Sequence, residues 1–322
     1  MTYGWVNYAK GIGIILVVYG HVMRGLYNAG LLSNALLFNF LDKVIYSFHM
    51  PLFFFISGLF FVQSIERRGV VGLVNSKIKT IAYPYFLWIV IQFLVSYLFN
   101  GLTNTDVKLE SLYSIFWRPF DHFWFLYALF LVFSVYSLIY KVNNSVIFIL
   151  SLSFLAYFFK GYLYVPWGIF NSVFTFGIYF CLGMLFNKYF LMPNDFSKIF
   201  LIAISLVFFF MQWYFFGFLE LGYVSSYVTL ILASVSIFFI VTFSGFLFDV
   251  NLKFVQYLGL YSLEIYLLHI IFSSGFRIVL QAFFHVDLEV VHIVGGTLMG
   301  ILCPIIFVLF VNKFRIPFLF RI

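Results

Sequence analysis

The chain alternates long apolar stretches with short polar connections along its whole length. A membrane-spanning helix needs roughly 17 to 25 mostly apolar residues. By that measure the pattern predicts ten spans, near residues 5–24, 45–63, 79–99, 122–140, 145–160, 168–187, 199–217, 224–246, 257–278 and 291–311. The stretch at 145–160 is short, so nine or eleven spans also fit. The expected fold class is an all-α, polytopic membrane helix bundle.

The polar connections are too short to hold a separate soluble domain, since the longest runs roughly from Asn100 to Asp121. We therefore treat residues 1–322 as one transmembrane domain whose working side chains lie in the membrane or in its loops. No repeat of fixed period is visible, which weakly disfavours the inverted-repeat transporter folds.

Composition supports the membrane class and predicts an orientation. Apolar residues make up 64% of the chain and charged residues 9%, against about 25% charged in an average soluble domain. Ten spans put both termini on one side, and that side holds twice as many lysines and arginines as the other. Both termini are therefore expected in the cytoplasm. The net charge of +7 is explained by loop cations near anionic lipid, so no nucleic-acid partner is expected.

The first apolar run contains two ionisable side chains, Lys10 and His21. Such groups are costly inside lipid and are mostly kept there for function. Eleven residues are close to three helical turns, so the two side chains share one helix face, about 16 Å apart along the axis. With the N-terminus inside, Lys10 lies near the inner face and His21 toward the outer face. We interpret His21 as a functional residue.

Three predicted helix ends carry polar side chains to the same outer depth. The second span is expected to begin near Tyr46, with Pro51 in its first turn, where the missing N–H costs nothing. Its short connection makes it a neighbour of the first span. The side chains at this depth are His21, Arg24, His49, Arg118, Asp121, His122 and Trp124. The alternative for each single residue is a snorkelling charge or an interfacial aromatic ring.

The ninth predicted span carries a polar stripe. Ser262, Tyr266, His269 and Ser273 follow at i, i+4, i+7 and i+11, which is one helix face. Glu264 lies off this stripe. The alternative to a catalytic role is a hydrogen-bonded network that only joins helices.

The predicted connection between the second and third spans is rich in cations: Arg67, Arg68, Lys77 and Lys79. They either set the topology or hold the phosphates of a cytosolic cofactor. The two cysteines, Cys181 and Cys303, are isolated and form neither a disulfide framework nor a metal site. Phosphate-loop, zinc-protease and serine-hydrolase motifs are missing.

Four segments form a series along the chain: Ala9–His21, Phe48–Gly58, Trp124–Phe130 and Gly259–His269. Together they resemble the acyltransferase-3 family of ten-span membrane O-acyltransferases, especially its compact fucose-4-O-acetylase-like branch. Family members typically carry an arginine eleven residues before the first-span histidine. Here Lys10 keeps the charge but lacks the bidentate fork of arginine. Many relatives also have a C-terminal extracytoplasmic esterase-like domain, and we expect the branch without it.

The resemblance implies transfer of an acyl group, usually acetyl, from cytoplasmic acetyl-CoA to a hydroxyl of a cell-surface or lipid-linked glycan. It implies no metal and a place in the inner membrane of a bacterial cell. His21 is the expected general base, because histidine titrates near neutral pH, and an acyl-histidine intermediate is the open variant. The candidate residues are His21, His49 and His269 for catalysis; Lys10, Arg67, Arg68, Lys77 and Lys79 for the donor; and Arg24, Arg118, Asp121, His122, Trp124 and Glu264 for the acceptor.

The alternative function is a proton-coupled transporter or flippase of a polar or lipid-linked solute, in which the same histidines relay protons. The missing repeats argue against it, and the four matching segments argue more strongly. Membrane lipids are the other expected partners. The sequence leaves a homo-oligomer open, because lipid-facing and partner-facing phenylalanines look alike.

Overall fold

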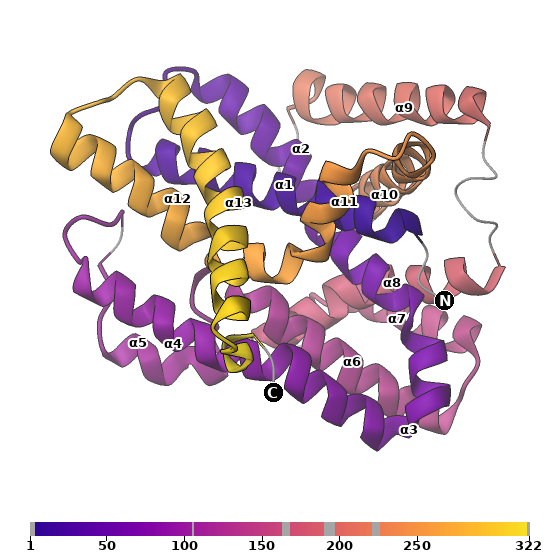
Figure 1. Ribbon diagram of the computed structural model, residues 1–322. Helices are drawn as coiled ribbons and strands as arrows, with labels where there is room; N and C mark the ends of the chain where they lie inside the picture. Colours follow the sequence, from indigo (N-terminus) through magenta and orange to yellow (C-terminus); the bar gives the residue numbers. More distant parts are fainter. Residues whose placement is uncertain (1–3, 105, 163–167, 190–196, 221–225, 321–322) are drawn as a thin grey trace. The chain divides into compact units, whose positions relative to one another are not determined.

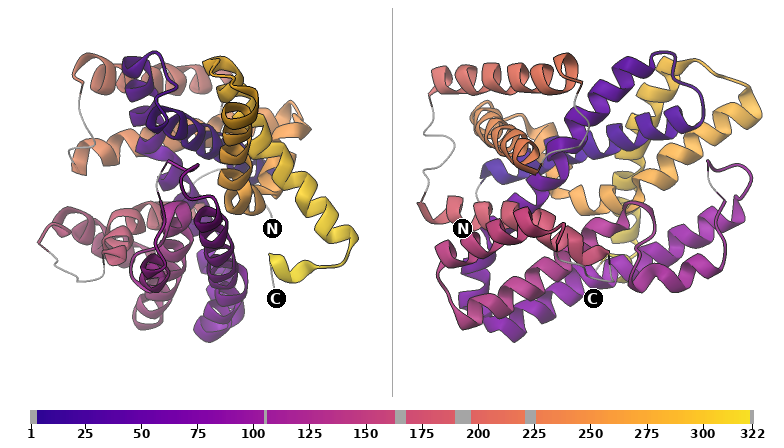
Figure 2. Two further views of the ribbon diagram at one scale, coloured as in Figure 1. Left: turned by 90° about the vertical axis from the view of Figure 1, so that its left-hand side faces the viewer. Right: turned by 180° about the vertical axis from the view of Figure 1, so that it is seen from behind.

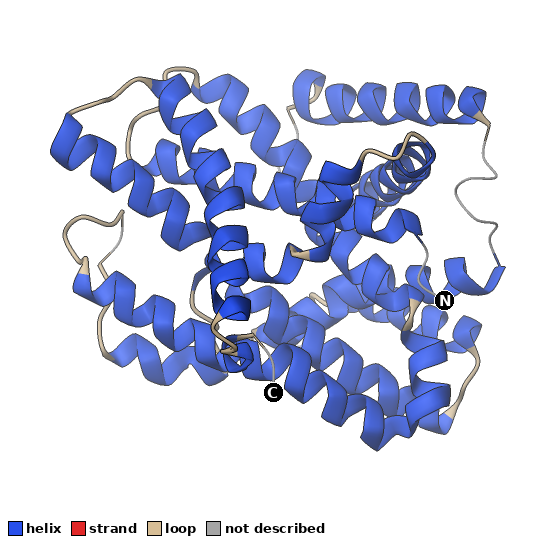
Figure 3. Ribbon diagram, in the orientation of Figure 1, coloured by secondary structure: helices blue, strands red, loops and turns tan. Residues whose placement is uncertain are grey.

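The computed structural model of the chain describes residues 4–104, 106–162, 168–189, 197–220 and 226–320. These residues form helices joined by loops and turns, and no strand occurs among them (Figure 3). The predicted all-α class is therefore confirmed. The sidedness of the termini stays a prediction.

Nine helical stretches of the described residues are long and apolar enough to cross a membrane. They are Gly4–Asn28, Ala35–Leu59, Phe61–Leu98, Ser114–Val142, Ile169–Tyr189, Lys198–Phe218, Tyr227–Asp249, Ser262–Phe284 and Glu289–Lys313. A further apolar helix, Val146–Phe159, has 14 residues, which is shorter than the roughly 17 residues that a span needs. Each of the ten predicted apolar segments thus corresponds to helix, and the chain is a multi-pass membrane protein.

The chain divides into two compact units, and each is described by itself. Unit 1 comprises Met1–Met50, Phe99–Asp106 and Leu191–Phe314, and unit 2 comprises Pro51–Leu98, Val107–Phe190 and Arg315–Ile322. The chain passes from unit 1 to unit 2 inside helix α2 (Ala35–Leu59), at Pro51. Proline has no N–H, so the helix lacks one backbone hydrogen bond at that point.

The predicted start of the second span was wrong. Helix α2 begins at Ala35, so Pro51 lies in the helix interior and not in its first turn. The Asn34 side chain accepts a hydrogen bond of 2.9 Å from the Leu37 N–H, which caps the helix start. Polar residues such as Asp42 lowered the apolar signal there, although they are helical.

Unit 1 is built around α1 (Gly4–Asn28), which packs against four other helices of the unit (Figures 1 and 2). Its helices are α1, the first part of α2, α9 (Lys198–Gln212) with its π-helical continuation η5 (Trp213–Phe218), α10 (Ser226–Asp249), α11 (Lys253–Leu260), α12 (Ser262–Phe284) and α13 (Glu289–Lys313). The predicted span at 257–278 is interrupted: α11 ends at Leu260, Tyr261 leaves the helical conformation, and α12 begins at Ser262.

Glycines allow α1 and α11 to approach each other closely. A Cβ at Gly11 would overlap the backbone carbonyl of Val255, and one at Gly259 would overlap the carbonyl of Asn7. Small residues at helix interfaces are a general device of membrane bundles, because they let two backbones approach.

Unit 2 contains the remainder of α2 and the helices that lie between it and the last segment of unit 1, Leu191–Phe314. They are α3 (Phe61–Lys77), the π-helical turn η1 (Ile78–Ala82), α4 (Tyr83–Leu98), α5 (Glu110–Tyr113), η2 (Ser114–Phe116), η3 (Asp121–Phe123), α6 (Trp124–Val142), α7 (Val146–Phe159) and α8 (Ile169–Tyr189), with η6 (Pro317–Leu319) near the C-terminus. The α2 and α8 backbones meet at Gly58 and Gly183, where a Cβ would overlap the carbonyls of Phe180 and Phe55.

The cation-rich connection after the second span is helical, which the sequence pattern did not predict. It forms α3, interrupted at Gly69, whose φ of 67° and ψ of 173° are outside the helical region. Glycine adopts positive φ at little cost. Charged and polar residues hid this helix from a search for apolar stretches.

The packing of α1 on α11 gives a first prediction. Gly259→Ala should lower the free energy of unfolding by about 1–3 kcal/mol, because the new methyl group meets backbone and not a flexible side chain. The matched control is Gly275→Ala on α12, where a Cβ finds no atom within 4 Å. Thermal unfolding of the purified protein measures both. Equal melting temperatures for the two variants would contradict the close approach.

Candidate functional site

The side chains of His21 on α1 and His269 on α12 lie against each other in unit 1. Their ring centroids are 5.1 Å apart and the ring planes are inclined by 55°. His269 is fully buried and His21 is half-buried. The structure therefore joins two histidines that come from opposite ends of the sequence and from separate matching segments.

Backbone carbonyls fix the protonation of two histidines. The Nδ1 atom of His269 lies 2.8 Å from the carbonyl oxygen of Tyr266, and the Nδ1 atom of His49 lies 2.7 Å from that of Ile45. A carbonyl oxygen only accepts, so each Nδ1 carries the proton and donates it. In the neutral ring Nε2 is then the basic nitrogen, and the same bond holds the ring orientation.

Tyr46 on α2 connects His21 with His49. Its ring meets the His21 ring edge-on with centroids 6.2 Å apart, and the His49 ring at 4.5 Å. His49 is 1% exposed. We call His21, Tyr46, His49 and His269 the histidine cluster of unit 1.

Arg24 and Asp42 hold one side of this cluster. The Arg24 guanidinium carbon lies 3.1 Å from the centre of the Tyr46 ring. Its Nε and Nη2 atoms donate to the two carboxylate oxygens of Asp42, at 2.6 and 2.9 Å. This fork joins the end of α1 to α2 and confirms that the first two spans are neighbours within unit 1.

Sequence reasoning missed Asp42 and Tyr46. Both lie on α2, four residues apart and therefore on one helix face. The sequence did show that Asp42 is a carboxylate inside a largely apolar segment. Such a group needs a cation as partner, which could have indicated its role.

Lys10 and Glu264 lie farther along the same pair of helices, α1 and α12. Glu264 is the charged group that acts electrostatically on Lys10. Both side chains are half-buried. The structure thus relates Glu264, expected to bind the acceptor, to the lysine that was expected to bind the donor.

The four outer-depth candidates of the fourth span belong to unit 2. Asp121 has a φ of 49°, and its Oδ2 accepts from Gln92 Nε2 at 3.2 Å and lies 3.5 Å from His122 Nδ1. His122 and Gln92 are buried, whereas Arg118 is exposed. The rings of Trp124 and Phe176 contact each other in a tilted arrangement, with centroids 5.2 Å apart and planes inclined by 33°. Sequence reasoning missed Gln92, since a single amide in an apolar helix is an ordinary observation.

The predicted donor cations also belong to unit 2. Arg67 and Arg68 are exposed on α3, where Arg68 Nη1 donates to Ser76 Oγ at 2.5 Å. The Lys77 ammonium lies 4.0 Å from the centre of the Phe133 ring, and Lys79 is exposed in η1.

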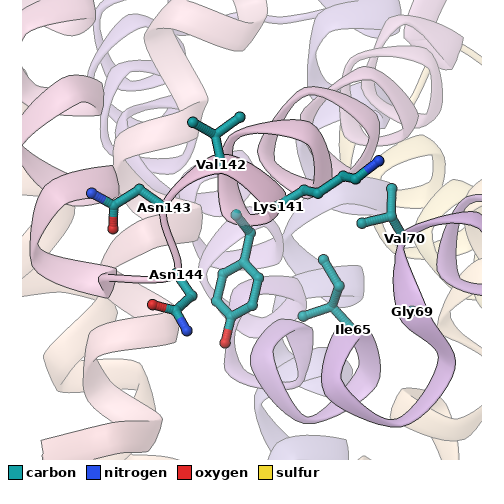
Figure 4. A pocket seen from close by; sticks show the side chains of 8 residues that line it. Ile65, Gly69, Val70, Lys141, Val142, Asn143 and Asn144 are labelled. Carbon is teal, nitrogen blue, oxygen red and sulfur yellow. The ribbon is translucent and has the colours of Figure 1, made fainter.

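An open pocket of about 500 Å³ lies where α3 bends at Gly69 beside the end of α6 (Figure 4). Its lining residues are Ile65, Gly69, Val70, Tyr140, Lys141, Val142, Asn143 and Asn144. The Tyr140 hydroxyl donates to Glu66 at 3.1 Å. The pocket therefore combines an ammonium group, two amides and an aromatic ring, and Arg67 and Arg68 follow on the same helix as Ile65.

The fold and the buried histidines define a multi-pass membrane protein with acid–base groups inside one of its helical units. The chain belongs to the acyltransferase-3 family, because the sequence model of the acyltransferase domain, Acyl_transf_3, matches residues 3–309. The resemblance found in the sequence is thereby confirmed.

Nodulation protein NolL of Mesorhizobium japonicum is a relative, 28% identical over 186 residues. The match covers 56% of this chain and 47% of NolL, so the chain aligns with about half of that protein. No solved structure matches the chain.

The Arg24–Asp42 fork gives the second prediction. Arg24→Met and Asp42→Asn should each lower the melting temperature, and the double variant should lose less than the sum. We expect a coupling energy of about 1 kcal/mol. The control cycle pairs Asp42→Asn with Lys43→Met, since Lys43 contacts the Glu220 carbonyl instead. Additive effects in the Arg24 cycle would show that the fork does not stabilise unit 1.

Proposed function

We propose that the protein transfers an acetyl group from cytoplasmic acetyl-CoA to a hydroxyl of a cell-surface or lipid-linked glycan. The proposed location is the bacterial inner membrane. The family supports acyl transfer. The observation that carries the proposal is the contact of His21 with His269, two titratable rings 5.1 Å apart inside an apolar bundle.

In the proposed reaction His21 is the general base. It takes the proton of the acceptor hydroxyl as that oxygen attacks the thioester carbonyl. The new C–O bond forms, the C–S bond of the donor breaks, and the departing CoA sulfur receives the proton that His21 carries. The acetyl ester and coenzyme A are the two products.

His269 is suited to stabilise the protonated His21 ring. Its Nδ1–H is committed to the Tyr266 carbonyl, so Nε2 is the nitrogen that accepts from a neighbouring imidazolium. The 5.1 Å between ring centroids is compatible with such an N–H···N bond. An acyl-histidine intermediate on His21 remains the variant, and it predicts a covalent acetyl group on this residue in the absence of acceptor.

Arg24 and His49 act in this proposal through Tyr46. Asp42 already occupies two donor groups of Arg24, so we assign this arginine to positioning rather than to the tetrahedral oxyanion. His49 contacts Tyr46 from the other side. Together they hold the ring that meets His21 edge-on.

For the donor we assign the nucleotide end of coenzyme A to the pocket of unit 2. Pockets of roughly 300 to 1,000 Å³ hold small ligands, and this one has about 500 Å³. Lys141 would pair with a phosphate, the amides of Asn143 and Asn144 suit the edge of a base, and the Tyr140 ring suits its face. Arg67, Arg68, Lys77 and Lys79 supply further positive charge.

The remaining acceptor candidates are Arg118, Asp121, His122 and Trp124 in unit 2 and Glu264 in unit 1. Asp121, with Gln92 bonded to it, presents hydroxyl-binding groups, and a tryptophan such as Trp124 can stack on a sugar ring. Glu264 acts on Lys10, which favours a role in placing α12 beside α1.

The third prediction tests the base. His21→Ala should lower acceptor-dependent cleavage of acetyl-CoA by about 10²- to 10⁴-fold, since general-base catalysis contributes that much. The assay measures thiol release and acetylation of surface glycans by purified protein in lipid nanodiscs. His285→Ala, an exposed loop histidine, is the control. Wild-type turnover by a folded His21→Ala protein would overturn the assignment, and solute movement without thioester cleavage would favour transport.

The fourth prediction tests the donor pocket. Lys141→Ala should raise the acetyl-CoA KM about tenfold or more with little change in kcat, because a charge-assisted hydrogen bond contributes about 1.5–3 kcal/mol. Lys188→Ala is the matched control, since that lysine lies over Tyr189 and does not line the pocket. Steady-state kinetics measure both. An equal donor KM in the two variants would place the nucleotide elsewhere.

A further inference from the structure

Arg277 extends the polar stripe of α12 beyond Ser273. His269, Ser273 and Arg277 follow at i, i+4 and i+8, so they share one helix face. Their exposed fractions are 0%, 7% and 8%. A buried guanidinium therefore lies on the same face as the histidine that contacts His21.

The packing around this stripe is tight. A Cβ at Gly300 of α13 would lie 2.8 Å from Val18 Cγ1 of α1 and 3.4 Å from Ser273 Cβ of α12. Helices α12 and α13 pack against each other at an angle in unit 1 (Figures 1 and 2). An arginine that snorkels keeps its head group in water. Arg277 is instead enclosed by the helices of the bundle.

The described residues give Arg277 little compensation. Its hydrogen bond is to Gln281 Oε1 at 3.5 Å, beyond the usual distance for a good bond. No carboxylate of the described residues forms an ion pair with it. Arg24 differs, because its guanidinium donates two hydrogen bonds, of 2.6 and 2.9 Å, to the carboxylate of Asp42.

Three acidic side chains of the helices of unit 1 have partners other than Arg277. Asp42 pairs with Arg24, Glu264 acts on Lys10, and Glu289 accepts the Ser33 hydroxyl and N–H. A guanidinium stays charged and has five N–H donors. Burying such a group without an anion is costly. An anion bound beside Arg277 would therefore be stabilising.

We propose that Arg277 binds an anionic oxygen group, a carboxylate or a phosphate, on the acyl acceptor. This inference rests on the proposed function, because it names the chemical class of the acceptor. The planar fork of arginine matches both groups. Eight helical residues separate Arg277 from His269 by about 12 Å along the axis. The anionic group of the acceptor therefore lies on the acylated sugar or on the sugar residue next to it.

The first experiment measures binding without catalysis. Purified protein in phosphatidylcholine nanodiscs is unfolded thermally with glucose, glucuronate or glucose 1-phosphate at equal ionic strength. Ligands that bind the native state raise the melting temperature. We expect a rise with at least one of the anions and none with glucose. Arg277→Gln should lose this rise, and Arg277→Lys should keep part of it.

The control for this binding experiment is Arg315→Gln, an exposed arginine that the proposed function assigns to no ligand. It should respond to the anions like the wild type. The inference is overturned if glucose raises the melting temperature as much as the anions, if Arg277→Gln keeps the response, or if neither anion has an effect on the wild type.

A second readout separates ligand binding from a structural role. A buried charge that serves a ligand does not stabilise the empty protein, and replacing it with an apolar group of similar size is neutral or stabilising. Arg277→Met should therefore melt at or above the wild-type temperature without ligand. A large loss of stability would assign Arg277 to the fold and overturn the inference.

Lipid headgroups also carry phosphate groups, so a separate experiment tests whether Arg277 binds a lipid. Wild type and Arg277→Gln are compared in phosphatidylcholine and in phosphatidylglycerol nanodiscs without sugar. Equal differences between the two proteins in both lipids support the acceptor. Stabilisation of the wild type alone by phosphatidylglycerol would assign Arg277 to a lipid and overturn the inference.

The catalytic arm uses surface glycans separated by anion exchange into acidic and neutral pools. Acetyl from acetyl-CoA should enter the acidic pool, and Arg277→Gln should lower kcat/KM for that pool by about ten- to a hundredfold with an unchanged donor KM. Acetylation of the neutral pool, unaffected by Arg277→Gln, would overturn this inference and leave the proposed function intact. No thioester cleavage with either pool would instead overturn the proposed function, while the melting experiments still test the arginine.

Discussion

A charged or titratable side chain inside an apolar bundle needs a partner, and this requirement organises unit 1. Asp42 compensates Arg24, Glu264 acts on Lys10, and backbone carbonyls accept the Nδ1 protons of His49 and His269. Two of these interactions also join helices: Arg24–Asp42 joins α1 to α2, and Lys10–Glu264 joins α1 to α12. For these two cations, the group that compensates the charge also holds the helices together, so a variant that removes one partner changes both.

Close helix packing makes this compensation possible. Gly11 and Gly259 allow α1 to meet α11 backbone to backbone, and Gly300 allows α13 to approach both α1 and α12. With larger residues at these positions the helices would separate, and the rings of His21 and His269 would separate with them. The glycines therefore contribute to the proposed chemistry through distance and not through contact with substrate.

The apolar pattern was sufficient to predict the helical class and the approximate place of the apolar helices, but not the start of the second span, the break at Tyr261 or the polar helical segments. Residues around Asp42 and those of α3 are helical although they interrupt the apolar pattern. Single titratable residues in apolar runs pointed to His21, His49 and His269. Their partners were hidden, because the Arg24–Asp42 fork and the His21–His269 contact depend on tertiary packing. Arg277 resembled an ordinary loop-side cation until its burial and its weak compensation were known.

The distribution of charge in unit 1 also bears on which substrate each cation serves. Lys10 and Arg24 each have an acidic group that acts on them, Glu264 and Asp42 respectively. Arg277 has none among the described residues, and it lies on the face of the helix that presents His269. The exposed cations of unit 2 suit the mobile, heavily charged phosphates of a soluble donor, whose binding tolerates water. A single enclosed guanidinium suits a fixed anion next to the reacting hydroxyl, where the charge selects the acceptor and sets its orientation.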